Sequence, residues 1–178
     1  MTLINEQNCI IVAIDFQEKL VRMLEKNDSA IKMEKLLTCA QIMNIPAIIT
    51  EQYPQGLGTT IPNIDTTPFT VIEKTAFSAM QEEKFKNALK NSGRKQVIIG
   101  GIETHICTHQ TVAELIEEGY EVFVVKDACA SRKKDEHKAG LDAMKQNGAK
   151  ITCLEIVLFE LLRSSKHANF KAVQALIK

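Results

Sequence analysis

The 178-residue sequence has no net charge, because 22 Lys and Arg residues balance 22 Asp and Glu residues. Without an excess of positive charge, no electrostatic field favours nucleic acid or an anionic membrane surface. No apolar run approaches the roughly 18 residues that a membrane-spanning helix needs, and no basic segment precedes an apolar one at the amino terminus. We therefore expect a cytoplasmic protein that binds neither nucleic acid nor membrane.

Paired cysteines and nucleotide-binding motifs are also missing. The five cysteines are an odd number, are scattered and form no C-x-x-C pair, so neither a disulfide framework nor a structural zinc site is predicted. There is no G-x-G-x-x-G run after a strand and no Walker motif. Nothing in the sequence points to a nucleotide or dinucleotide, and we expect no cofactor.

What the sequence does contain is a series of short apolar runs, separated by segments of helical period. The runs are rich in β-branched residues and do not alternate with polar ones, which is typical of strands covered on both faces of a parallel sheet. They lie at 9–15, 45–50, 69–74, 96–101, 121–128 and 149–155. Regular alternation of strand and helix predicts right-handed βαβ units and an open, doubly wound α/β sheet in a single domain over residues 1–178.

One predicted connection is unusually long. The stretch "EQYPQGLGTTIPNIDTTP" (51–68) holds three of the four prolines and no helical pattern, so we predict a loop at the carboxyl end of the second strand. Loops of this length often cover or line a functional site. A plain surface excursion fits the sequence equally well.

Three reactive side chains stand at the carboxyl ends of predicted strands. Asp15 ends the first run, Lys74 ends the third, and Cys107 follows the fourth. Each has an ordinary explanation when taken alone: a helix N-cap, a solvated lysine and a small buried residue. In open α/β sheets, however, ligands bind at the carboxyl ends of the strands, so their coincidence favours one shared site.

This set of residues suits nucleophilic catalysis. A thiol in the first turn of a helix is stabilised as a thiolate by the helix dipole, and a nearby ammonium adds to the effect, so we expect Cys107 to be a nucleophile near neutral pH. Asp15 within hydrogen-bond reach would act as general base and then as general acid. Backbone N–H groups in the tight turn before the helix would hold an oxyanion.

The stretch "GGIETHICTHQ" (100–110) also raises the question of a metal. His105 and His109 are four residues apart and would share a face of an α-helix. Cys107 would lie about 200° around that helix from each of them, so the three side chains cannot converge on one ion. The H-E-x-x-H pattern fails as well, because Ile106 stands where its Glu would be. We expect no metal and a surface or packing role for both histidines.

Several motifs together resemble a known family. The ordered set "IVAIDFQ", "VIEKTAFSA" and "GIETHICTHQTVAELIEEGYEVFVVKDACASR" resembles the isochorismatase-like cysteine hydrolases, from Cys9 to about Lys178. The segments "EQYPQGLG" and "DACASR" make the isochorismatase domain-containing proteins the nearest match. The resemblance implies a Rossmann-like three-layer α/β/α sandwich with a six-stranded parallel sheet, and a homo-oligomer of two or more subunits.

The resemblance also implies a site. Asp15, Lys74 and Cys107 would form a catalytic triad, with a covalent intermediate on the cysteine that water resolves. A non-proline cis peptide bond between Ile102 and Glu103 would aim the amides of Glu103 and Cys107 at the oxyanion. Four residues that flank the motif positions are candidates for the substrate pocket, or for ordinary packing or capping: Gln17, Tyr53, Phe77 and Thr104.

Departures from the family limit the choice of function. Nicotinamidase-type members hold a metal with an Asp and two His near the second and third strands, whereas this chain has Glu51, Gln52 and Tyr53 there and no histidine before His105. We therefore expect a metal-independent hydrolase that cleaves a small amide, carbamoyl or related C–N bond. The alternatives are a catalytically idle oligomeric binding module and a metal-dependent amidase of the nicotinamidase type.

Overall fold

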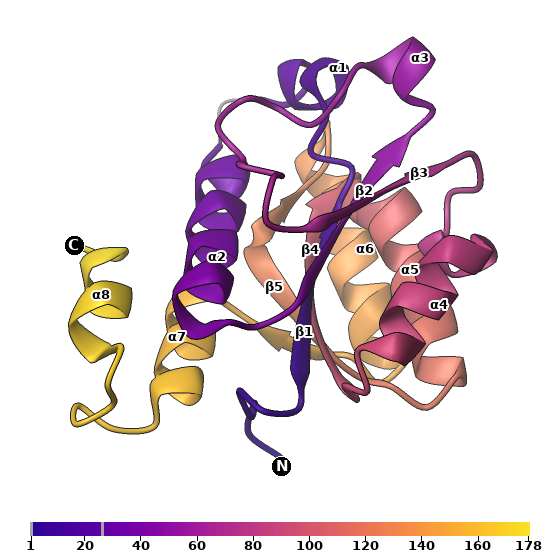
Figure 1. The fold of residues 1–178 in the computed structure, drawn as a ribbon. Coiled ribbons are helices and arrows are strands. Elements are labelled where there is room, and N and C mark those ends of the chain that lie inside the picture. Colours follow the sequence, from indigo (N-terminus) through magenta and orange to yellow (C-terminus); the bar gives the residue numbers. More distant parts are fainter. Residues whose placement is uncertain (1, 26) are drawn as a thin grey trace.

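The computed structural model of the chain describes residues 2–25 and 27–178, and in it six parallel strands form one sheet (Figure 1). The strand order across the sheet is β3-β2-β1-β4-β5-β6. The strands are β1 (Cys9–Ile14), β2 (Ala47–Gln52), β3 (Thr70–Lys74), β4 (Gln96–Ile102), β5 (Glu121–Ala130) and β6 (Lys150–Thr152). The predicted six-stranded parallel sheet with helices on both sides is confirmed.

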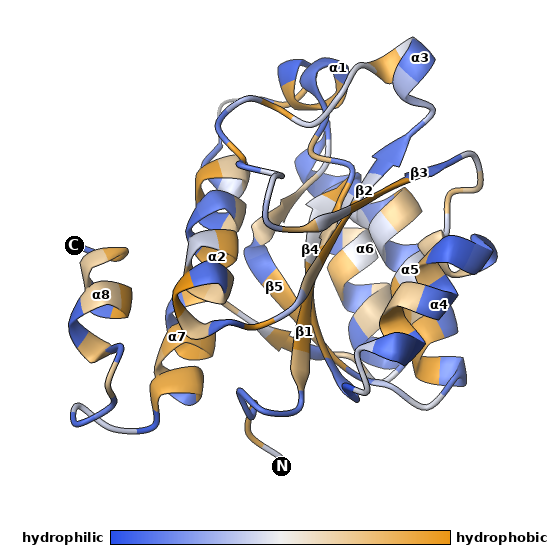
Figure 2. Cartoon of the chain, viewed as in Figure 1, coloured by the Kyte–Doolittle hydropathy of each residue, from blue (hydrophilic) through white to orange (hydrophobic). Residues whose placement is uncertain are grey.

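Helices cover both faces of the sheet. On one face lie α2 (Ser29–Met43), α7 (Leu154–Leu162) and α8 (Phe170–Ala175), and on the other lie α4 (Glu83–Asn91), α5 (His109–Glu117) and α6 (Lys134–Gln146) (Figure 1). Along β1, Ile11 and Ala13 pack into the first layer, whereas Ile10, Val12 and Ile14 pack into the second. Both faces of β1 are therefore buried, which explains its unalternated apolar sequence (Figure 2).

The order in which successive strands are added to the sheet reverses once, although all strands run parallel. From β1 the chain runs outward through β2 and β3, and then returns to place β4 against the other edge of β1. The carboxyl ends of β1 and β4 thus flank the point where the strand order reverses, which is where open α/β sheets bind their ligands.

The connection after β2 differs from the predicted loop. β2 continues to Gln52, and one helical turn, α3 (Pro54–Leu57), follows directly. Pro54 at the first helical position favours this turn, because its φ angle is already helical and its missing N–H is not needed there. Another short helix, α1 (Glu18–Arg22), lies beside α3 (Figure 1). The expectation of no helix between 51 and 68 was wrong for this one turn, which is too short for a periodic pattern.

Among the helices of the described residues, none combines the length and the apolar character that crossing a bilayer would require.

Candidate active site

Asp15 lies one residue beyond β1, in the left-handed conformation with φ of 56°. Its side chain is fully buried, and Thr50 Oγ1 donates a hydrogen bond to Oδ1 at 2.7 Å. The Asp15 N–H in turn donates to the Thr50 carbonyl at 3.2 Å. Thr50 pairs with Ile14 in the register of β1 and β2, so the sheet itself brings the hydroxyl to the carboxylate.

Lys74 is the last residue of β3, and it reaches across β2 to Asp15. Its Nζ lies 2.8 Å from Asp15 Oδ2, and both side chains are shielded from solvent. Nζ also donates to Gln52 Oε1 at 2.6 Å and to the Phe77 carbonyl at 2.9 Å. These acceptors offset part of the cost of burying an ammonium, which is otherwise high.

Cys107 lies in η2 (Thr104–Thr108), a π-helical turn between β4 and α5. It is 6% exposed, and the side chains of Asp15 and Lys74 both interact with its thiol. The structure therefore brings together the three residues that the sequence placed at the ends of separate strands. Single π-helical turns occur frequently at functional sites.

The protonation state of Cys107 differs from the expectation. Burial raises the pKa of its thiol to about 12; the charge of Asp15 also raises it, and the ammonium of Lys74 lowers it. The loss of solvation outweighs the nearby positive charge, so the thiol is protonated at neutral pH. The prediction of a resting thiolate near neutral pH was wrong, because it counted the helix dipole and Lys74 but not the burial.

Gly101 allows η2 to pack closely against the end of β1. A Cβ atom at this position would lie 2.5 Å from Ile14 Cβ and 2.5 Å from Thr108 Oγ1. Contacts this short do not occur between real side chains, so only glycine lets β1, β4 and the π-helical turn pack this closely. Gly101 is thus needed for close packing at this point.

The peptide bond between Ile102 and Glu103 is cis, at the position that the family resemblance implied. The Glu103 carbonyl accepts hydrogen bonds from Ile106 N at 3.1 Å and from Thr108 N at 3.3 Å, which ties the start of η2 to its end. The Glu103 side chain points to Arg132, whose Nε lies 2.5 Å from Oε1. An oxyanion hole made of the Glu103 and Cys107 amides stays a prediction.

The four candidates for the substrate pocket fall into two pairs. Gln17 and Thr104 are fully buried and bonded within the protein. Gln17 Nε2 donates to the carbonyls of Gln52 and Gly58, and Thr104 Oγ1 lies 2.8 Å from His137 Nδ1.

Tyr53 and Phe77, the other two candidates, are 55% and 54% exposed and follow the strand ends that carry Gln52 and Lys74. An open hollow of about 280 Å³ lies beside Tyr53 and reaches Lys74. Neither Asp15 nor Cys107 lines this hollow.

Sequence reasoning missed two residues that position Asp15 and Lys74, namely Thr50 and Gln52. Both lie on β2 between the strands of Asp15 and Lys74, and Gln52 is the register partner of Lys74. Their side chains hold the carboxylate and the ammonium in place. The signal that would have found them is the strand order, because only a β2 between β1 and β3 puts these residues at the site.

The two histidines of the 100–110 stretch, His105 and His109, have different surroundings in the structure. The spacing of about 100° per residue assumed an α-helix, but residues 104–108 form a π-helical turn, so it does not apply there. His105 turns toward Glu103 and Glu136, and these three residues form a group that could hold a metal ion. His109 and Cys107 are not part of that group.

Comparison with known proteins finds a matching family model and relatives of similar sequence. The model of the isochorismatase domain matches residues 9–156. Isochorismatase domain-containing protein 2 of Xenopus laevis is 34% identical over 175 residues, which cover 98% of this chain and 85% of that protein.

Solved structures share the fold over nearly the whole chain. The structure described as MAR1 ribonuclease from Caenorhabditis elegans is 36% identical, with a TM-score of 0.92, and the match covers 99% of this chain and 92% of that one. YcaC from Pseudomonas aeruginosa, described with hexane-2,5-diol and covalent acrylamide, is 25% identical, with a TM-score of 0.89 over 98% and 91% of the two chains. YcaC from Escherichia coli, described as an octameric hydrolase of unknown specificity, is 27% identical, with a TM-score of 0.89 over 98% and 88%.

Proposed function

The chain belongs to the isochorismatase family of hydrolases, and on that premise we propose that it is a metal-independent cysteine hydrolase. Cys107 attacks a small amide, carbamoyl or related C–N bond and forms a covalent intermediate. The observation that carries the proposal is the buried ion pair of Asp15 and Lys74 beside the Cys107 thiol. A thiol, a carboxylate and an ammonium in one buried site are the groups that such a reaction needs.

The first half of the reaction forms a thioester or a carbamoyl-cysteine. As Cys107 Sγ bonds to the carbonyl carbon, Asp15 takes the thiol proton, and the amides of Glu103 and Cys107 hold the oxyanion. When the tetrahedral intermediate collapses, the C–N bond breaks and Asp15 returns the proton to the leaving amine. Lys74 stabilises the negative charge, which lies on Asp15 in the resting site and on sulfur during attack.

The second half releases the acyl group. Asp15 takes a proton from a water molecule that attacks the acyl carbon, and the C–S bond then breaks. The sulfur regains a proton from Asp15, so the enzyme returns to its starting state and the net reaction is hydrolysis.

The high pKa of the thiol gives Asp15 a specific role. With a pKa of about 12, the resting thiol has few thiolates to offer at neutral pH, so removal of its proton has to accompany formation of the C–S bond. Asp15 Oδ2 suits this task, because its partner is the Lys74 ammonium and no hydrogen-bond donor of good geometry reaches it from the described residues. This oxygen is open to the thiol proton.

The relatives supply support of a different kind. The YcaC structure described with covalent acrylamide indicates that a related protein carries a group able to react with that compound. Acrylamide is an amide-bearing electrophile that thiols attack, which fits a nucleophilic cysteine. The octameric YcaC from Escherichia coli favours a homo-oligomer here as well.

We further propose that the substrate is a small molecule, that the protein acts in the cytoplasm and that it binds neither nucleic acid nor membrane. The equal numbers of basic and acidic residues favour a small substrate. Because one relative is described as a ribonuclease, RNA belongs in the test as a competing substrate.

The test is a substrate panel of small amides, carbamoyl compounds and RNA, assayed with wild type, Cys107→Ala and Cys153→Ala. Cys153 is a partly exposed cysteine outside the triad and serves as the matched control. We expect turnover with wild type and Cys153→Ala and none with Cys107→Ala, whose circular dichroism should match wild type. Turnover by Cys107→Ala would refute the mechanism.

Acrylamide distinguishes the idle alternative. Intact-mass spectrometry should detect an adduct on wild type and Cys153→Ala that Cys107→Ala lacks. No turnover on any compound together with no Cys107 adduct would favour a binding module. Cleavage of RNA alone would replace the small-amide substrate.

A further inference from the structure

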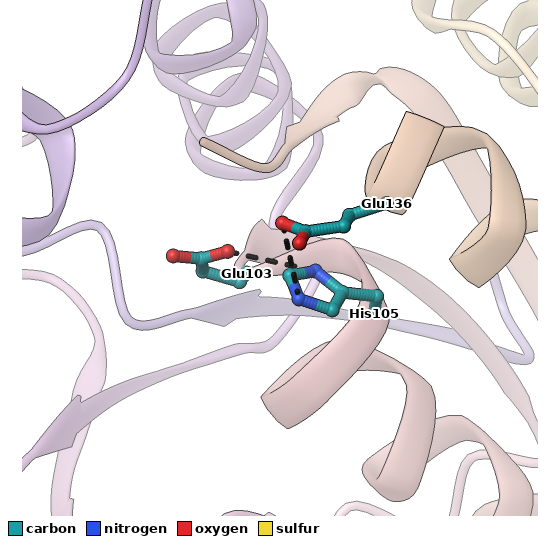
Figure 3. A group of neighbouring side chains, drawn as sticks. All are labelled: Glu103, His105 and Glu136. Carbon is teal, nitrogen blue, oxygen red and sulfur yellow. Dashed lines mark ion pairs between the residues drawn. The ribbon is translucent and has the colours of Figure 1, made fainter. Parts of the chain in front are cut away.

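We infer that Glu103, His105 and Glu136 form a binding site for a divalent metal ion, with Zn²⁺ the best match, which ties the catalytic turn η2 to helix α6. One candidate ligand atom from each residue lies within 4.8 Å of the other two. Figure 3 shows the His105 ring facing both carboxylates, with a dashed line to each. Imidazole nitrogen and carboxylate oxygen are both ordinary ligands of zinc.

The distances fit a small rearrangement. His105 Nε2, the ring nitrogen that would bind the ion, lies 3.6 Å from Glu136 Oε2, whereas Glu103 Oε2 lies 3.5 Å from the other ring nitrogen, Nδ1. Two ligand atoms bonded to one tetrahedral zinc ion stand roughly 3.4 Å apart, given bonds of about 2.1 Å. The group therefore has to contract by no more than about 1.4 Å between any two ligand atoms, from 4.8 Å at most, to hold an ion. Glu136 is partly exposed on the first turn of α6 and is free to make this movement.

A second observation points to a ligand at this place. Glu103 is only 6% exposed, and its Oε2 accepts no hydrogen bond from the described residues. Arg132 occupies the other oxygen, Oε1, and leaves Oε2 facing His105. Buried carboxylate oxygens without a donor are rare, because each one loses the solvation it had in water. A bound cation would satisfy this oxygen.

Neighbouring groups have the positions of outer-shell partners. Ser131 Oγ lies 3.0 Å from His105 Nδ1, so it can hold the ring and leave Nε2 for the ion. Arg132 orients the Glu103 carboxylate in the same way. Hydrogen-bonded partners of this kind are usual around metal-binding histidines and carboxylates. Each carboxylate also has a basic neighbour, since Arg132 pairs with Glu103 and the exposed Lys133 lies 3.8 Å from Glu136 Oε1.

The location suggests what the ion does. A Cβ atom at Gly140 of α6 would lie 2.8 Å from His105 Cα, so the backbones of α6 and η2 are already in close contact. An ion bound by residues of both segments would fix η2, the turn that carries Cys107, against α6. The triad residues are not among its ligands. The role we infer is therefore structural, and it does not depend on the proposed hydrolase activity.

The test is calorimetric titration of ZnCl₂ into untagged, chelator-treated full-length protein, with Mg²⁺ as the comparison ion. We expect one zinc per chain, little binding of Mg²⁺, and at least about a tenfold weaker affinity for Glu136→Gln, because one of three protein ligands loses its charge. Co²⁺ should give the visible absorption bands of a tetrahedral site in wild type and lose them in Glu136→Gln. Zinc should also raise the melting temperature of wild type more than that of the variant.

Two controls exclude other zinc sites. Glu83→Gln removes an exposed carboxylate of α4 and should leave zinc binding unchanged, and so should Cys107→Ala. Equal affinity in wild type and Glu136→Gln, or binding lost only in Cys107→Ala, would overturn the inference. No binding of zinc at any concentration tested would also overturn it.

Discussion

Replacing Lys74 by Met should lower the free energy of unfolding by about 3–5 kcal/mol, because it leaves the Asp15 carboxylate buried without its counter-charge. The structure sets this magnitude at the high end for an ion pair. Nζ and Oδ2 are 2.8 Å apart, both side chains are shielded from solvent, and among the described residues the other side-chain donor to the carboxylate is the Thr50 hydroxyl. Equilibrium urea denaturation followed by circular dichroism measures the loss.

A double variant separates the ion pair from side-chain packing. Asp15→Asn combined with Lys74→Met removes both charges, so its loss should be smaller than the sum of the two single losses by about 2 kcal/mol or more. The matched control is Lys86→Met, which breaks the exposed pair with Glu83 and should cost no more than about 1 kcal/mol. Additive losses, or a Lys74→Met variant as stable as Lys86→Met, would refute the account of a strongly coupled buried pair.

Two further predictions follow from buried thiols and from close packing. Burial raises the pKa of four thiols to about 12, so the folded state keeps these protons when the unfolded state loses them above pH 9, and stability should fall as pH rises from 9 toward 12. At pH 10 the loss is roughly 1.4 kcal/mol per thiol, measurable as a lower urea midpoint than at pH 7, and an unchanged midpoint would contradict the burial of Cys9, Cys39, Cys107 and Cys129. Gly101→Ala should cost about 1–3 kcal/mol, because the new methyl meets Ile14 and Thr108 at 2.5 Å. Gly101→Ala should also slow any turnover that depends on Cys107. Gly93→Ala, whose new Cβ has no atom within 4 Å, measures the cost of a positive φ in the absence of a clash.

The strands could be predicted from sequence because their signal is local. β1 and β4 are buried along their whole length, and a strand covered on both faces appears in the sequence as an unbroken apolar run. The short helix α3 escaped prediction for the opposite reason. Four residues cannot display a helical period, so only the packing of that segment reveals the turn.

The identity of the site residues could be predicted from the sequence, but the protonation state of the thiol could not. Asp15, Lys74 and Cys107 could be named, since reactive side chains at strand ends meet at one edge of a parallel sheet. The charge of the thiol could not be predicted, because burial dominates its pKa and burial depends on every segment that covers the site. The same is true of Glu136, which lies 31 positions after His105 in the sequence and meets it only through the packing of α6.

The sequence by itself determined the class of the fold and the family, and it named Asp15, Lys74 and Cys107 as residues that would meet at the strand ends, because strand periodicity, residue type and ordered motifs are all properties of the linear chain. Only the tertiary structure decided that β2 stands between β1 and β3, and that Thr50 and Gln52 therefore bind the side chains of Asp15 and Lys74. It also decided that Cys107 rests as a thiol and that one of the two histidines of the 100–110 stretch, His105, faces a pair of carboxylates. The physical reason is common to all of these: they depend on solvation and on contacts between distant segments, which exist only once the chain has folded.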